Sequence, residues 1–259
     1  MIARIVGDRR ARALGRRIDK PEAVVVAVIQ AAIATVGWLV GDPVWVSVAV
    51  ALQLAVGGIG AVYVIGPVQF PFGMSRYAMP AAAGIGATLA GRLVPGGVSL
   101  ILVPLVVVLL WSVLYVEVRA ARLGAARTIQ ELLLTAIMFT TAAGVYALID
   151  PRNSLVAVGV LAPIALVIGM RSAEGRGTRG ADAVGQALLH TLAVVQVAAA
   201  VALLELPGVV GPAIISLGFY AWGGAVDALR EGASARSVAI EFGALAGLGV
   251  AVALLLQRF

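Results

Sequence analysis

Long apolar runs without charged residues limit most strongly what this chain can fold into. The stretch from Asp182 to Glu205 has an acid at each end and no charged residue between them. A helix needs about 20 apolar residues to cross the ~30 Å hydrocarbon core of a bilayer, and this run is long enough. Further runs of similar length are separated by short links that carry arginine. The chain is therefore expected to cross a membrane several times.

The low charge content leads to the same expectation. Of the 259 residues, 61% are hydrophobic and 12% are charged, whereas about a quarter are charged in ordinary soluble domains. Backbone groups in lipid must pair internally, so a spanning segment is a helix or part of a closed barrel. The apolar runs are continuous and do not alternate as barrel strands do. The sequence therefore predicts an all-α fold, a polytopic α-helical transmembrane bundle.

About nine spans are expected, and the basic residues between them predict the orientation. Nine spans place 16 of the 19 lysine and arginine residues on the side of the N-terminus. Basic links are retained in the cytoplasm, so the N-terminus is predicted to be cytoplasmic and the C-terminus outside. The third span, rich in alanine and glycine, is the weakest. The expected spans are 21–40, 43–66, 78–94, 98–116, 131–149, 154–170, 182–205, 208–225 and 238–256.

The chain divides into a basic cytoplasmic segment, residues 1–20, and a single transmembrane helical domain, residues 21–259. The first segment contains seven basic residues, which suit the anionic lipid headgroups of a cytoplasmic leaflet. Topology accounts for the arginines, so nucleic acid is not an expected partner. We expect a multi-pass protein of the cell membrane, the inner one where there are two, in contact with the lipid bilayer. Other membrane proteins, or copies of the same chain, are the further partners that remain open.

Polar side chains inside the spans are the candidate site residues. His190 lies about eight residues into its span, near mid-membrane, and Gln186 precedes it by one helical turn on the same face. An ionisable residue at this depth is a candidate for substrate binding or proton relay. The alternative is a neutral imidazole that bonds to Gln186 or to a carbonyl of a neighbouring helix and joins the bundle. With one histidine and no cysteine, no metal site and no cofactor are expected.

Three further residues complete the substrate-binding or proton-relay candidates. Gln30 and Gln53 are amides in the middle of the first two spans, where each must find a partner within the bundle. They are expected to face the same interior as His190, or to join helices. Glu241 lies about one turn inside the last span. It is expected to reach the cytoplasmic face, to pair with Arg236, or to act in function.

Two links between spans have recognisable local patterns. Thr128 and Glu131 have the spacing of a capping box, in which the two side chains satisfy the free N–H groups at a helix start. Residues 171–182 are polar and rich in glycine. We expect these residues to form a flexible loop.

Three functions are compatible with these features. The first is a transporter or permease, and a neutral or lipid-like substrate fits because few buried counter-charges are visible. The second is a non-catalytic scaffold or the anchor subunit of a larger complex, since small residues suited to helix packing are abundant. The third is an intramembrane enzyme that modifies a lipid with His190 as acid or base. No catalytic residue is assigned, and the chain is expected not to be an enzyme.

Overall fold

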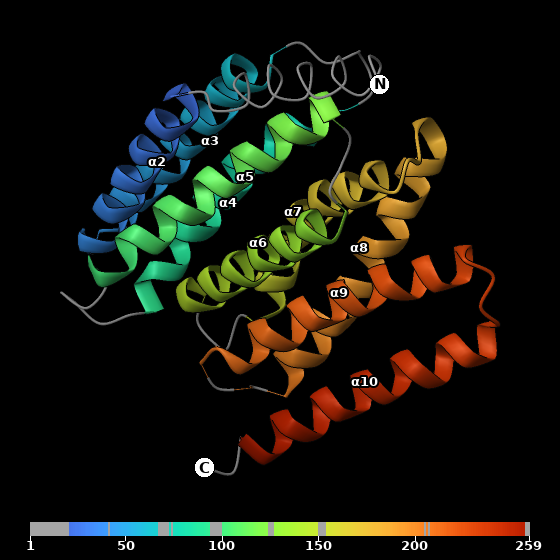
Figure 1. Ribbon diagram of the computed structural model, residues 1–259. Helices are drawn as coiled ribbons and strands as arrows, with labels where there is room; N and C mark the ends of the chain where they lie inside the picture. Colours follow the sequence, from blue (N-terminus) through green and yellow to red (C-terminus); the bar gives the residue numbers. More distant parts are fainter. Residues whose placement is uncertain are drawn as a thin grey trace, which may run out of the picture.

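The described part of the chain is helical throughout. The computed structural model describes residues 21–40, 42–66, 73, 75–93, 100–123, 127–149, 154–204, 206 and 208–256. The predicted basic segment 1–20 lies outside these residues. Within them the chain forms nine α-helices (Figure 1) and short 3₁₀ turns at 91–93, labelled η1, and at 100–102. These are α2 (Pro21–Leu39), α3 (Pro43–Ile65), α4 (Ser75–Ala90), η1 (Gly91–Leu93), α5 (Val103–Leu123), α6 (Arg127–Leu148), α7 (Ser154–Gly175), α8 (Gly180–Leu203), α9 (Val210–Arg230) and α10 (Ala235–Leu256).

Each predicted span corresponds to one of these helices. Within the described residues, α2, α3, α5, α6, α7 and α8 contain stretches long and apolar enough to cross a membrane. The prediction of a multi-pass, all-α membrane protein is thereby confirmed. The other three helices, α4, α9 and α10, are not among these six, and α4 has only 16 residues. Nine complete crossings therefore remain a prediction.

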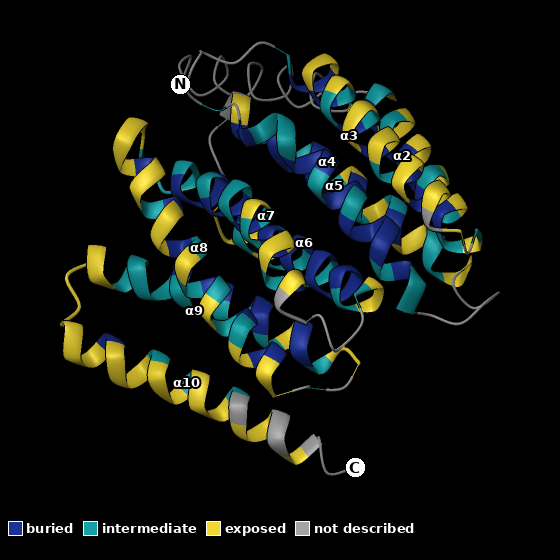
Figure 2. Cartoon of the chain, turned by 180° about the vertical axis from the view of Figure 1, so that it is seen from behind, coloured by how far each residue is buried: buried dark blue, intermediate teal, exposed yellow. Residues whose placement is uncertain are grey.

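The helices form two groups that meet at one interface. Helices α2, α3, α4 and α5 pack on one another, α6, α7, α8, α9 and α10 form the second group, and α4 packs against α6 about as extensively as against α3. Figure 1 shows the two groups side by side. The interface consists mainly of α4 against α6 and α7, with α5 beside α6, and we call it the seam. Ten of the sixteen residues of α4 are buried, whereas α10 is mostly exposed (Figure 2).

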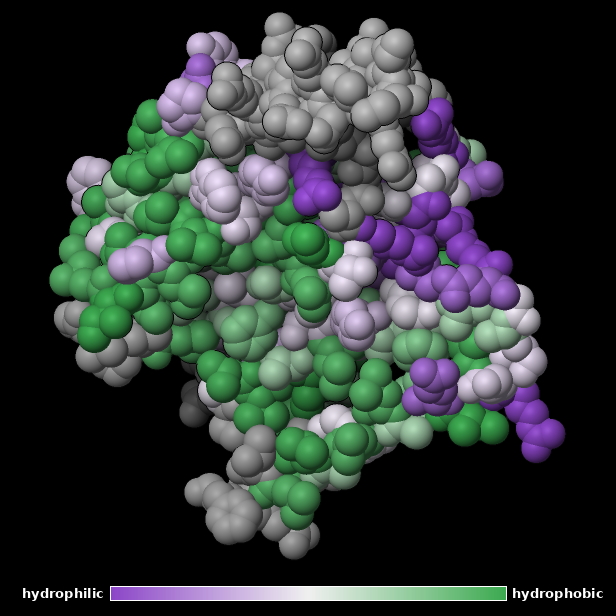
Figure 3. Space-filling model, in the orientation of Figure 1, coloured by the Kyte–Doolittle hydropathy of each residue, from purple (hydrophilic) through white to green (hydrophobic). Residues whose placement is uncertain are grey.

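Polar contacts join several helices at one end of the bundle, which we call the polar end. Ser75 and Gly73, at the start of α4, contact Glu174 near the end of α7. Figure 3 shows hydrophilic residues gathered along one edge of the molecule, while apolar residues cover much of the remaining face. At the opposite end, Arg92 donates to the carbonyl of Val40, 3.2 Å away, beyond the last turn of α2.

Two expected boundaries are corrected by the structure. The fourth span was expected to end at residue 116, but α5 continues to Leu123, so Glu117 lies inside the helix. The flexible loop expected at 171–182 is also wrong. Helix α7 extends to Gly175, and the side chains of Arg171 and Ser172 are fully buried. The charged side chains of Glu117 and Arg171 can lie inside helices because they bind each other across α5 and α7.

Candidate functional site

A buried ion pair joins the two helix groups at the polar end. The guanidinium of Arg171 on α7 meets the carboxylate of Glu117 on α5 in a bidentate arrangement. Nε donates to Oε1 at 2.8 Å, and Nη2 donates to Oε2 at 2.8 Å. The two side chains are only 1% and 3% exposed. Two parallel charge-assisted hydrogen bonds of this kind fix the geometry strongly.

A second contact crosses the seam close to this pair. The carboxylate of Glu174 accepts a hydrogen bond of 3.2 Å from the backbone N–H of Gly73 and a short one from the hydroxyl of Ser75. A negative charge at this place also suits the N-terminal end of α4. Arg76, in the same turn, lies within electrostatic reach of Arg171, Glu117 and Glu174. The start of α4 is thereby tied to the end of α7.

Arg176 organises a second ionic cluster within the α6–α10 group. Its side chain is 2% exposed, and its Nε donates to Asp227 on α9 at 2.9 Å. Its Nη2 lies 3.3 Å from Glu131 on α6 but in poor hydrogen-bond geometry. Glu131 also accepts a 2.8 Å hydrogen bond from Ser172, and Arg127 contacts the other oxygen of Asp227. Three helices and the turn after α7 are joined in this way.

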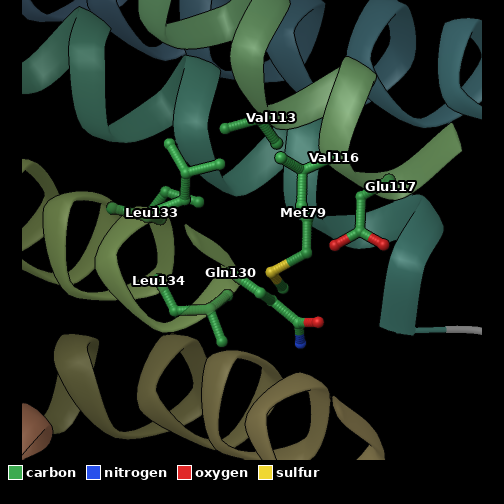
Figure 4. A pocket seen from close by; sticks show the side chains of 8 residues that line it. Met79, Val113, Val116, Glu117, Gln130, Leu133 and Leu134 are labelled. Atoms are coloured by element: carbon green, nitrogen blue, oxygen red, sulfur yellow. The ribbon is translucent and has the colours of Figure 1, made fainter. Parts of the chain in front are cut away.

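A small cavity lies in the seam beside the buried ion pair (Figure 4). It has a free volume of about 10 Å³, roughly the room that one water needs. Figure 4 shows Glu117, Gln130 and Met79 approaching it from α5, α6 and α4. The amide of Gln130 donates to the carbonyl of Arg171 at 3.2 Å, and its Oε1 is buried without a hydrogen-bond partner. The lining residues are Met79, Val113, Val116, Glu117, Gln130, Leu133, Leu134 and Ile137.

His190 lies apart from this cavity and makes its polar contact with a neighbouring helix. Its Nε2 lies 2.9 Å from the carbonyl oxygen of Phe219 on α9. The imidazole also stacks on the Phe219 ring at a centroid distance of 4.2 Å. Gln186 does not supply the partner, because its Oε1 accepts a hydrogen bond from Thr178. A contact of this kind, with a carbonyl of a neighbouring helix, is the structural alternative that the sequence offered to substrate binding or proton relay by His190.

We expect His190→Ala to lower the free energy of unfolding by about 1–3 kcal/mol, because a hydrogen bond and a buried ring are lost. Reversible denaturation by SDS in mixed micelles measures the change. Leu189→Ala, at a neighbouring lipid-facing position that is 56% exposed, is the matched control and should change stability much less. Equal losses for both variants would contradict the structural role of the His190 contact.

The two mid-membrane glutamines form a polar cluster of their own. Gln30 donates to Gln53 Oε1 at 3.1 Å and to the carbonyl of Pro80 at 2.9 Å. Gln53 donates to the carbonyl of Gln30 at 2.7 Å and to Thr88 Oγ1 at 3.1 Å. Both glutamines are fully buried. They join α2, α3 and α4, so each finds its partners within the first helix group.

The predicted site residues are therefore not brought together. The glutamine cluster belongs to the α2–α5 group, whereas His190 and Gln186 lie on α8 of the other group. Glu241 is exposed on α10, a helix that packs against α9. Within the described residues, no three histidine, aspartate or glutamate side chains gather closely enough to hold a metal ion.

The ionic residues at the seam were not identified as site residues from the sequence. The capping box expected at Thr128 and Glu131 is wrong, because α6 already begins at Arg127 and Glu131 binds Ser172 and Arg176 instead. One signal was present. Glu117 and Arg171 each adjoin an apolar run directly, where a charged side chain needs a partner.

Comparison with known proteins gives no identification. No family model matches the chain, and neither a curated protein nor a solved structure shows significant similarity to it. The function must therefore be argued from the site.

Proposed function

We propose that this protein is a membrane transporter of the permease type, which moves a neutral or lipid-like solute along the seam. The supporting observation is the position of the Glu117–Arg171 pair. It joins the two helix groups next to a cavity that lies between them. Transport needs helices that move relative to each other with a site between them, and we place that site in the seam.

The buried ion pair favours transport over a purely structural role. Desolvating two charges costs several kcal/mol, and apolar residues of similar volume often give equal or greater stability. A bundle that serves only as a scaffold gains little from such a pair. A contact that opens and closes must return to one closed geometry. An ion pair provides that geometry because each charge has a defined partner in the closed state.

The chemistry of the cavity supports the proposed solute class. Six of its eight lining residues are apolar. The carboxylate of Glu117 is engaged by Arg171, so no free charge faces a charged solute. An uncharged molecule with apolar surface suits these walls better than an ion does.

A scaffold or anchor subunit is the second candidate, and α10 is the observation that favours it. Its side chains of Ile240, Leu248 and Leu255 are all more than 60% exposed. A methyl group added at Gly243 or Gly247 would meet nothing within 4 Å. A helix of this kind can receive another membrane helix. The third function, a lipid-modifying enzyme based on His190, has less support because that imidazole is already bonded and stacked.

We place the polar end in the cytoplasm, with segment 1–20 on the anionic leaflet of the cell membrane. The structure supports this arrangement by gathering Arg127, Arg171, Arg176 and Arg230 at one end. Cytoplasmic links retain arginine. An odd number of crossings then places the C-terminus outside.

Flux into vesicles tests the proposed transport. Purified protein is reconstituted, glycerol and urea entry is followed by light scattering, and lipid transfer is followed with NBD-labelled phosphatidylcholine. We expect at least one probe to move several-fold faster than in protein-free vesicles. Leu133→Phe, which fills the cavity, should reduce that flux about tenfold, because the added ring occupies the space between the groups.

Leu132→Phe is the matched control, since Leu132 is the adjacent residue and is 57% exposed to lipid. Its flux should equal that of the unchanged protein. If no probe crosses faster than in protein-free vesicles, the transport proposal fails and the scaffold function takes its place. Equal flux for Leu133→Phe and Leu132→Phe would show that the solute does not pass through the cavity.

A further inference from the structure

The two ends of the seam are held together by different kinds of contact. At the polar end, the groups are joined by the Glu117–Arg171 pair and by Glu174 with Ser75. At the opposite end, the described residues of α4 and α6 touch through close packing. A Cβ added to Gly144 on α6 would lie 2.1 Å from the Cβ of Leu89 and 2.8 Å from the backbone nitrogen of Ala90. The helices are therefore as close as glycine allows at that end.

These two kinds of contact respond differently to separation. An ion pair that opens into water loses its Coulomb attraction but recovers the hydration of both charges, so the net change is small. Closely packed apolar surfaces that part inside the bundle leave a void and lose their dispersion contacts. The polar end therefore separates more easily than the end at Gly144.

The ion pair lies at the edge of the cavity that is nearer the polar end, and Glu117 itself lines the cavity. Arg171 is four residues from the last residue of α7, Gly175, or ~6 Å at 1.5 Å per residue. Gln130 contacts Arg171 at this level, and the cavity extends along α6 to Ile137, seven residues deeper. Glu117 and Gln130 therefore line the polar-end side of the cavity, and Val113 and Ile137 lie deeper along α5 and α6.

We propose that the Glu117–Arg171 and Glu174–Ser75 contacts form a gate at the polar end of the seam, and that the packing of Gly144 on Leu89 is its pivot. The gate opens the cavity to the aqueous side of the polar end while the opposite end stays closed. This inference deepens the transport proposal and rests on it, because it names how access to the same cavity is controlled.

Thiol labelling tests the gate without any need to know the solute. The chain contains no cysteine, so a single Val113→Cys gives one thiol in the cavity wall. The probe is 2-(trimethylammonium)ethyl methanethiosulfonate, which does not cross membranes, added to intact cells or to inverted vesicles. Arg236→Cys, exposed in the first turn of α10, reports from which side the polar end is reached. Val194→Cys, 1% exposed on α8 outside the cavity, is the buried control.

We expect Val113→Cys to be labelled only from the side that labels Arg236→Cys. Adding Glu117→Gln, which breaks the pair, should raise its labelling rate about tenfold, equivalent to ~1.4 kcal/mol. The double change Glu117→Leu with Arg171→Met should lower the labelling rate below that of the unchanged gate, because apolar side chains gain no favourable hydration when the contact opens. Val194→Cys should label slowly in every background.

Two results would overturn the gate. One is labelling of Val113→Cys from the side opposite Arg236→Cys. The other is a rate that is the same with the intact pair, with Glu117→Gln and with the apolar pair. Where Glu117→Gln does not fold, Ser75→Ala weakens the second contact more mildly and must raise the rate as well. Labelling reports opening, not flux, so a failed gate and failed transport give separate results.

Discussion

Arg171→Ala is expected to be among the most destabilising substitutions in the chain, with a loss of about 3–5 kcal/mol in the free energy of unfolding. The substitution leaves Glu117 buried, 3% exposed, without the guanidinium that binds both of its oxygens. That carboxylate then has no direct ion-pair partner and keeps Arg76 only as a more distant counter-charge. Reversible SDS denaturation in mixed micelles, or steric trapping in bicelles, measures the loss.

Two comparisons make this result specific to the buried pair. Arg127→Ala removes an arginine that is 44% exposed and contacts Asp227, so its loss should stay below about 1 kcal/mol. Glu117→Leu with Arg171→Met removes both charges and should restore stability to near that of the unchanged protein. If the double variant were as unstable as Arg171→Ala, packing volume rather than an unpaired charge would account for the loss.

The helices could be predicted from the sequence because lipid imposes a strict rule on them. Each spanning segment must satisfy its own backbone, so an apolar run of sufficient length becomes a helix. The run that includes Asp182 and Glu205 corresponds to α8, Gly180–Leu203, within two residues at each end. Even the weak third run, predicted at 78–94, corresponds to α4 with η1, because its small residues pack against five other helices, chiefly α3 and α6.

The site could not be predicted in the same way, because its residues meet only through tertiary structure. Glu117 and Arg171 are 54 positions apart, and neither has a local partner that marks it. Beside an apolar run, a charged residue is read as the start of a link. Here the helix continues, and the charge is compensated by another helix.

For the polar residues within the spans, the need for partners could be predicted, but their grouping could not. Gln30 and Gln53 were expected to need partners inside the bundle, and they bond to each other. Their separation from His190 could not be derived, since nothing in the sequence tells which helix faces are adjacent. His190 itself meets Phe219, 29 positions away.

Gly144→Ala is the other substitution with a large expected effect, because its methyl group has no space. The nearest atoms to the added Cβ are the Cβ of Leu89 at 2.1 Å, the carbonyl carbon of Leu89 at 2.7 Å and the nitrogen of Ala90 at 2.8 Å. Two of these are backbone atoms of α4, so no flexible side chain can move aside. Helices α4 and α6 must separate at the proposed pivot, at a cost of about 3 kcal/mol.

The matched control for this prediction is Gly159→Ala, in the interior of α7, where an added Cβ meets nothing within 4 Å. There alanine removes backbone freedom from the unfolded chain, so the helix should gain up to about 1 kcal/mol. The two variants carry the same chemical change and should differ in sign when their SDS denaturation midpoints are compared. Similar midpoints would mean that α4 and α6 are not in close contact at Gly144, and the gate would then have no pivot at that end. A loss of stability for Gly144→Ala with a gain for Gly159→Ala would show that the two helix groups pack at Gly144 too closely to admit one additional methyl group.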